Sequence, residues 1–155
     1  MRPPQLKCCS KRGPRIKNER RVSLSSAVLD SYALLAFLYQ EKGHKEIGDL
    51  LEKSLETDRL LLISAVNWAE IRYIIERKSG PEAWKKTRPK ILSLPIEIVP
   101  VDQTMAELAG EMKVSRKMSL ADCFVAALAK QQDGEIYTGD PEFRALEPEW
   151  KIVWL

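Results

Sequence analysis

At residues 120–129 the chain reads LADCFVAALA, and at residues 135–140 it reads EIYTGD. The first segment predicts a helix whose small apolar side chains allow close packing on a sheet, and the second predicts a short strand ending in a polar turn. With Ser119 as N-cap, the helix carries Asp122 in its first turn, on its apolar face. Asp140 follows the strand, at the edge of the sheet where open α/β folds bind ligands.

The composition predicts a single soluble domain. The chain has 155 residues, of which 45% are hydrophobic and 30% are charged, which is enough for one well-formed core. It contains no apolar run of about 18 residues, so no membrane association is expected. Its three cysteines, Cys8, Cys9 and Cys123, cannot form a disulfide framework, and this favours a reducing, cytoplasmic setting.

Positive charge is concentrated at the amino terminus. Residues 1–21 hold eight bases and one acid, a net charge of +7, whereas the whole chain is +3, so the remainder is mildly acidic at −4. This predicts a disordered basic tail at residues 1–24 and one folded domain at residues 25–155. The tail is expected either to bind nucleic acid or to be an extension without a role, and it lacks the apolar segment of a secretory signal.

Short apolar runs alternate with helical patterns along the domain, which predicts a three-layer α/β/α sandwich with a mainly parallel central sheet. Pro81 is expected to start the fourth helix, and Pro89 to kink or split it. The predicted strands are 27–29, 60–63, 96–101, 136–138 and 152–154, and the predicted helices are 31–39, 44–56, 65–78, 82–94, 103–112 and 119–131.

Four acidic residues fall near the expected edge of this sheet. Asp30 and Asp140 follow strands, Asp122 lies on the helix between, and Glu70 lies on a helix face that also carries Ile74 and is expected to face the core. Each acid has an ordinary interpretation as a helix cap, a solvated side chain, a dipole partner or a turn residue. Together, without matching arginines in these segments, they point to a divalent cation, and oxygen ligands suit Mg²⁺ or Mn²⁺ better than Zn²⁺.

Four segments resemble the motifs of the PIN domain (PilT N-terminus) family, and most of all those of its VapC-type toxins from VapBC toxin–antitoxin pairs. They are VLDSYALL at 28–35, SAVNWAEI at 64–71, LADCFVAALA at 120–129 and YTGDPEF at 137–143, within a likeness that covers about residues 26–155. The resemblance implies a PIN-like fold and a Mg²⁺- or Mn²⁺-dependent endoribonuclease that leaves a 5′-phosphate and a 3′-hydroxyl. The basic tail is the one departure from the family pattern.

The resemblance also implies roles for individual residues. Asp30, Glu70, Asp122 and Asp140 would be the metal-binding, catalytic acids. Thr138 matches a supporting hydroxyl position, although it would also suit an ordinary strand. Two basic stretches are candidates for RNA binding, with solvated surface as the alternative. The candidates for RNA binding are Arg72, Arg77, Lys78, Lys85, Lys86, Arg88 and Lys90 in one stretch and Lys113, Arg116 and Lys117 in the other. Asn67 is a further supporting residue of the acidic site, with support of the end of its helix alone as the alternative.

Partners follow partly from the residues and partly from the resemblance. The helix that carries Trp68, Tyr73 and Ile75 is apolar on more than one side, as expected for contact with another chain or for packing inside the domain. The resemblance implies a homodimer and a VapB-type antitoxin whose C-terminal segment binds between the early helices, with an arginine suited to the acidic site.

Other classes of protein are less consistent with the sequence. The sole histidine, His44, lies among charged residues, which argues against a Ser-His-Asp hydrolase, and Cys123 is expected to be a core thiol. No phosphate-binding loop or dinucleotide fingerprint occurs. A phosphoacceptor domain would leave Glu70 unexplained. The alternative that remains is a non-catalytic RNA- or protein-binding module on the same fold.

Overall fold

The computed structural model describes residues 25–155, and in them five strands form one parallel sheet. The strands are β1 (Ala27–Leu29), β2 (Leu61–Ser64), β3 (Ile96–Val99), β4 (Glu135–Thr138) and β5 (Ile152–Trp154), in the spatial order β3-β2-β1-β4-β5. All four neighbouring pairs are parallel, which confirms the prediction of a mainly parallel sheet.

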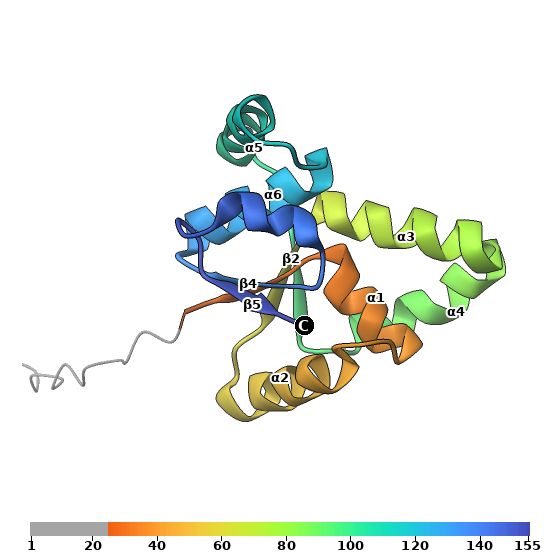
Figure 1. Ribbon diagram of the computed structural model, residues 1–155. Helices are drawn as coiled ribbons and strands as arrows, with labels where there is room; N and C mark the ends of the chain where they lie inside the picture. The colour runs from red at the N-terminus through yellow and green to blue at the C-terminus, as the bar shows by residue number, and fades with distance from the viewer. Residues whose placement is uncertain (1–24) are drawn as a thin grey trace, which may run out of the picture.

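Helices cover both faces of this sheet and confirm the three-layer sandwich (Figure 1). On one face, α6 packs with α5 and a 3₁₀ helix against Val28, Leu62 and Ile136. On the other, α1 and α2 pack against Leu29 and Leu61. The helices α3 and α4 pack on each other and extend outward from the sheet as an arm (Figure 1). Their bounds are α1 Ser31–Tyr39, α2 His44–Thr57, α3 Ala65–Ser79, α4 Pro81–Leu92, α5 Gln103–Ser115, α6 Leu120–Gln132 and the 3₁₀ helix η1 Pro141–Leu146.

Several predicted boundaries differ from the structure. The third strand ends at Val99, α5 runs on to Ser115, and η1 was not predicted at all. The prediction that Pro89 would split α4 is wrong, because the helix runs unbroken to Leu92. Both Pro89 and Lys85, whose carbonyl loses its helical donor, are exposed. Water can therefore satisfy that carbonyl, which limits the cost of the proline.

Two further sequence predictions concern the amino-terminal tail and membrane-spanning segments. The basic tail at residues 1–24 lies outside the described residues. Within residues 25–155, no helix is both long enough and apolar enough to cross a bilayer.

The pairing of β1 with β4 places the main polar residues side by side. Leu29 pairs with Tyr137 across the two parallel strands, and the Asp30 amide donates to the Tyr137 carbonyl over 3.4 Å. Asp30 and Thr138 therefore leave the sheet at the same edge, at the carboxyl ends of neighbouring strands. This is the edge at which open α/β sheets bind ligands.

Candidate active site

The Thr138 hydroxyl joins two of the predicted acids. Asp30 is 2% exposed, and its Oδ1 caps α1 by accepting from the Ala33 amide at 2.6 Å. Its Oδ2 accepts from Thr138 Oγ1 at 2.5 Å, and that same Oγ1 accepts from the Asp140 amide at 2.9 Å. Thr138 is fully buried and contacts both acids.

Asp122 and Asp140 lie close enough to Asp30 for their charges to affect its ionisation. Burial raises the pKa of Asp30 to about 7; hydrogen bonds from Thr138 and the Ala33 amide lower it, and the charges of Asp122 and Asp140 raise it. Burial likewise raises the pKa of Asp122 to about 6, opposed by the Ser119 hydrogen bond and reinforced by Asp140. The structure therefore brings these three acids together, and the charge of Asp140 disfavours ionisation of both Asp30 and Asp122.

Glu70 is linked to this group through the hydroxyl of Ser31. Its Oε2 accepts from Ser31 Oγ at 2.5 Å, and Ser31 directly follows Asp30. Its Oε1 accepts from the Tyr73 hydroxyl at 3.2 Å. Asn67, which is fully buried, donates through Nδ2 to Ser31 Oγ at 3.3 Å. Asn67 and Glu70 therefore contact the same serine hydroxyl.

The predicted orientation of α3 needs a correction. The face with Ile74 was expected to point into the core, but the buried residues are Asn67, Ile71 and Ile75. Glu70 and Ile74 are only half-buried, at the margin of that face. The reason is that Ile71 and Ile75 pack in one core cluster with residues of α1, β2 and α4, which turns this side of α3 inward.

Two residues of the site were missed in the sequence. Ser31 was read only as the start of a helix, yet it is buried and bonded to Glu70. Glu142 lies in a quoted motif without an assigned role, yet its charge raises the pKa of Asp122 and its Oε2 accepts from the Ser119 amide at 2.8 Å. Both positions adjoin predicted acids in the sequence, and that proximity was the available signal.

The residues fit a divalent cation by donor type and charge. Within residues 25–155, none of the four acids forms an ion pair with a lysine or arginine. A buried carboxylate without a cation is costly to ionise, and carboxylate oxygens are the ligands that Mg²⁺ and Mn²⁺ prefer. In the same part of the chain, however, no three histidine, cysteine or acidic side chains form a ready metal-binding group. The site is therefore suited to a cation without being a preassembled cage.

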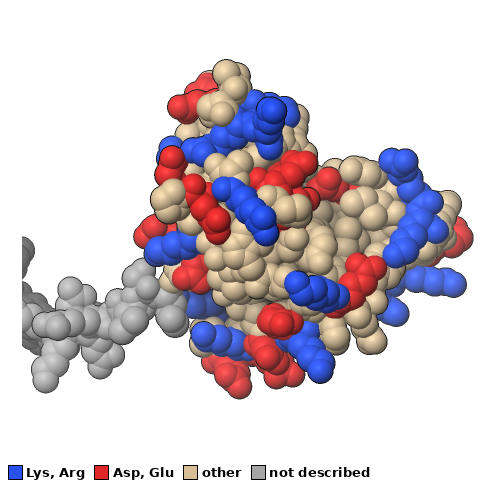
Figure 2. Space-filling view, viewed as in Figure 1, with Lys and Arg blue, Asp and Glu red and all other residues tan. Residues whose placement is uncertain are grey.

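The predicted RNA-binding residues occupy two regions on either side of acidic side chains (Figure 2). One region is the α3–α4 arm, where Arg72, Lys78 and Lys85 pair with Glu76, Glu41 and Glu82 at 3.0, 3.7 and 2.6 Å. The other precedes α6, where Arg116 pairs with Glu149 at 2.7 Å and lies over the Trp150 ring. The remaining candidates are all exposed, and they are Arg77, Lys86, Arg88, Lys90, Lys113 and Lys117.

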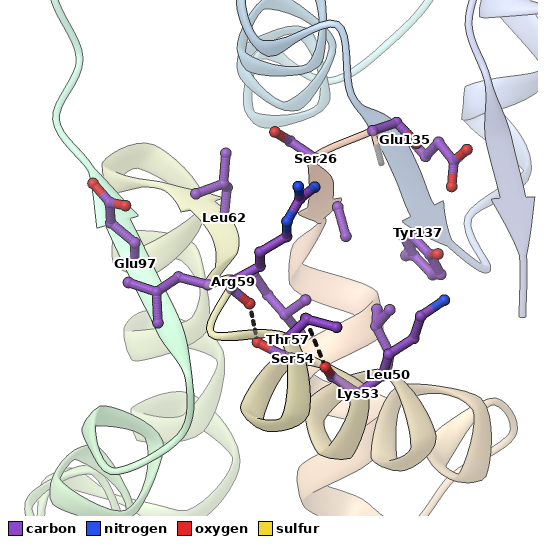
Figure 3. A pocket seen from close by; sticks show the side chains of 14 residues that line it. Ser26, Leu50, Lys53, Ser54, Thr57, Arg59, Leu62, Glu97, Glu135 and Tyr137 are labelled. Atoms are coloured by element: carbon purple, nitrogen blue, oxygen red, sulfur yellow. Dashed lines mark hydrogen bonds between the residues drawn. The ribbon is translucent and has the colours of Figure 1, made fainter. Parts of the chain in front are cut away.

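A cavity lies at the other end of the sheet's strands, away from these acids. Its volume is about 570 Å³, and it opens at the amino ends of the strands, between α2 and residues such as Ser26, Leu62 and Tyr137. Figure 3 shows the Arg59 side chain extending across it toward Ser26. Because its lining mixes acids, bases and leucines without a common chemistry, we place the candidate active site at the opposite, acidic edge of the sheet.

Comparison with known proteins identifies the family. The PIN domain family profile matches residues 27–147, so the chain belongs to the PIN domain family. None of the curated proteins compared with the chain matches it.

Solved structures share the fold at low sequence identity. VapBC2 from Rickettsia felis, bound to a promoter DNA fragment, has a TM-score of 0.65 and 16% identity, over 83% of this chain and 98% of that one. DNA-bound VapBC from Salmonella typhimurium has a TM-score of 0.64 and 19% identity, over 84% and 98%. VapC20 from Mycobacterium tuberculosis, a toxin that cleaves the sarcin–ricin loop, has a TM-score of 0.59 and 21% identity, over 79% and 95%.

Proposed function

We propose that the chain is a VapC-type toxin, a Mg²⁺- or Mn²⁺-dependent endoribonuclease. The observation that supports this most directly is the group of aspartates at the carboxyl ends of β1 and β4, two of them joined by the Thr138 hydroxyl. A PIN domain chain with uncompensated acids at this edge has the oxygen donors and the negative charge that a phosphodiesterase metal site needs.

In this proposal Asp30, Asp122 and Asp140 hold the ion, and Glu70 completes the site. When bound, a divalent cation lowers the pKa of a water ligand and offsets charge on the phosphate. Thr138 fixes the orientation of Asp30 by donating to Oδ2. Ser31 and Tyr73 hold the two oxygens of Glu70 at the half-exposed margin of the site, where this carboxylate can orient a water or accept a proton. Cleavage would leave a 5′-phosphate and a 3′-hydroxyl.

RNA would approach this acidic edge between the two basic regions. Cations on the α3–α4 arm and before α6 would contact phosphates on either side of the cleaved bond. Several of these side chains already pair with surface acids, as Arg72 does with Glu76. Such exposed pairs are weak, so exchanging one for an RNA phosphate has a small cost.

We also propose a VapB-type antitoxin as partner, a homodimer and a cytoplasmic location. Solved relatives of this fold are described as toxin–antitoxin complexes. An antitoxin arginine would offer a two-pronged ligand to the aspartates and could take the place of the cation. On α3, the ring of Trp68 packs edge-on against that of Trp84, with 5.0 Å between the ring centroids, so part of the apolar surface of α3 is buried within the domain. Tyr73, on the same helix, remains exposed.

A non-catalytic RNA- or protein-binding module is the second candidate. The observation that favours it is that, in residues 25–155, the acids do not form a ready metal-binding group. Such a module would bind RNA or protein but leave the RNA intact at any concentration of metal ion.

The deciding experiment is cleavage of a structured RNA by the purified full chain. We expect cleavage with Mn²⁺ or Mg²⁺, none in EDTA, and a loss of at least about a hundredfold for Asp30→Asn. Asp49→Asn, which neutralises an exposed acid on α2, is the matched control and should cleave normally. Cleavage that persists in EDTA or in Asp30→Asn would contradict the metal-dependent site, and intact RNA in all conditions would favour the binding module.

A further inference from the structure

Three residues form a row along α3 that leads outward from the acidic site. Glu70, Tyr73 and Arg77 are spaced three and four residues apart, so they lie on one side of the helix, spread over about 10 Å along its axis. Figure 1 shows α3 running from the sheet toward the outer end of the arm. The row therefore connects a predicted catalytic acid with the basic end of the arm.

Tyr73 is the exposed aromatic member of this row. Its side chain is 47% exposed, and its hydroxyl donates to Glu70 Oε1 at 3.2 Å. The bond to Glu70 anchors one end of the ring, while much of the ring remains accessible to solvent. An anchored, exposed aromatic ring is the usual platform on which single-stranded nucleic acids stack a base.

Arg77 supplies a cation next to this ring. Arg77 follows Tyr73 by four residues in α3, so the two side chains lie on the same side of the helix. Its neighbours Arg72 and Lys78 form ion pairs with Glu76 and Glu41. Within residues 25–155, Arg77 forms no such pair, and it is exposed.

We propose that Tyr73 and Arg77 bind the nucleotide adjacent to the cleaved bond of a single-stranded RNA region, the ring stacking on its base and the guanidinium contacting its phosphate. This inference rests on the proposed ribonuclease function. An aromatic ring flanked by a catalytic acid and an arginine matches a nucleotide better than a second copy of the chain, since the arginine would need an acid opposite it in a dimer.

The test measures RNA binding separately from cleavage. A short labelled single-stranded RNA is titrated by fluorescence anisotropy in EDTA with the full-length Asp30→Asn chain, in which we expect cleavage to be suppressed. The same titration is made with that chain carrying Tyr73→Phe, Tyr73→Leu or Arg77→Gln. We expect Tyr73→Phe to bind within about twofold of the parent and Tyr73→Leu to bind about tenfold more weakly. Arg77→Gln should weaken binding severalfold. It should also reduce the slope of the logarithm of the binding constant against the logarithm of the salt concentration by about one.

Lys130→Gln is the matched control, because it removes one exposed cation at the far end of α6 and should not alter binding. The proposal is overturned if Tyr73→Leu binds like the parent, if Tyr73→Phe is as weak as Tyr73→Leu, or if the parent binds no RNA. A change in mass by light scattering in Tyr73→Leu, with RNA affinity retained, would instead assign the ring to a dimer contact. Binding by the parent without cleavage by the wild-type chain in Mn²⁺ would contradict the proposed ribonuclease function alone.

Discussion

The hydroxyl of Thr138 donates to Asp30 Oδ2 at 2.5 Å, joining residues that are 108 positions apart in the chain. Both are buried, and the same hydroxyl oxygen accepts from the Asp140 amide. A single buried side chain thus contacts two acids that follow the carboxyl ends of neighbouring strands. Replacing it should affect the site more than its size suggests.

Thr138→Val keeps the shape of the side chain and removes the hydroxyl. We expect it to lose about 1–3 kcal/mol of stability, because the Asp140 amide and Asp30 each lose a buried partner. Cleavage should fall about ten- to a hundredfold, whereas Thr138→Ser should retain most activity. Urea unfolding and kcat/KM measure the two effects. A valine variant as active as the serine variant would show that the hydroxyl is not needed.

The raised pKa of Asp30 predicts how the metal-free protein responds to pH. The folded value of about 7 lies above the ordinary value of 3.8, so the folded state holds the proton more tightly than the unfolded state. This contribution to stability is complete below about pH 4 and is lost as pH rises through 7. Asp122, raised to about 6, acts in the same direction.

We therefore compare the free energy of unfolding of the wild-type chain with that of Asp30→Asn in EDTA. The wild-type value, relative to the Asp30→Asn value, should fall by up to a few kcal/mol between pH 4 and pH 8. Urea unfolding at fixed pH values measures the difference between the two chains, which removes the contribution of other acids. Added Mn²⁺ should reduce the difference, because a cation stabilises the ionised carboxylate. A difference that does not change with pH would mean that Asp30 ionises normally.

Local features of the site could be predicted from sequence, and tertiary ones could not. Asp30 and Ser119 were expected at helix starts, and both cap their helices, since capping depends on residues three positions away. Ser31 and Glu142 were missed, because their partners lie 39 and 23 residues away. The side of α3 that faces the core was mispredicted for the same reason, since the helices packed against it decide which side is buried.

Glu142→Gln tests the acid that the sequence did not reveal. Glutamine retains an oxygen for the Ser119 amide but removes the charge that raises the pKa of Asp122. With less negative charge at the site, the Mn²⁺ concentration for half-maximal cleavage should rise about two- to fivefold, with kcat at saturating Mn²⁺ nearly unchanged. Glu52→Gln, an exposed acid on α2, should leave both values unchanged. An unaltered Mn²⁺ requirement in Glu142→Gln would remove Glu142 from the site.

Gly139, between Thr138 and Asp140, is limited by space and not by backbone conformation. Within residues 25–155, the glycines with positive φ are Gly43 and Gly80, so the backbone at Gly139 would accept alanine. A Cβ there, however, would lie 2.2 Å from Cε1 of Tyr32. The ring therefore closes over the turn that carries Asp140, and Gly139→Ala must displace one or the other.

Gly139→Ala should lose about 1–3 kcal/mol of stability and most of its activity, because displacement of the turn moves the Asp140 amide away from Thr138. Adding Tyr32→Ala gives the new methyl group space, so the double variant should recover part of the loss and the two changes should be non-additive. Gly110→Ala is the control, since a Cβ there meets nothing within 4 Å and helical alanine should stabilise the protein slightly. Strictly additive losses in urea unfolding would show that Tyr32 does not hold this turn.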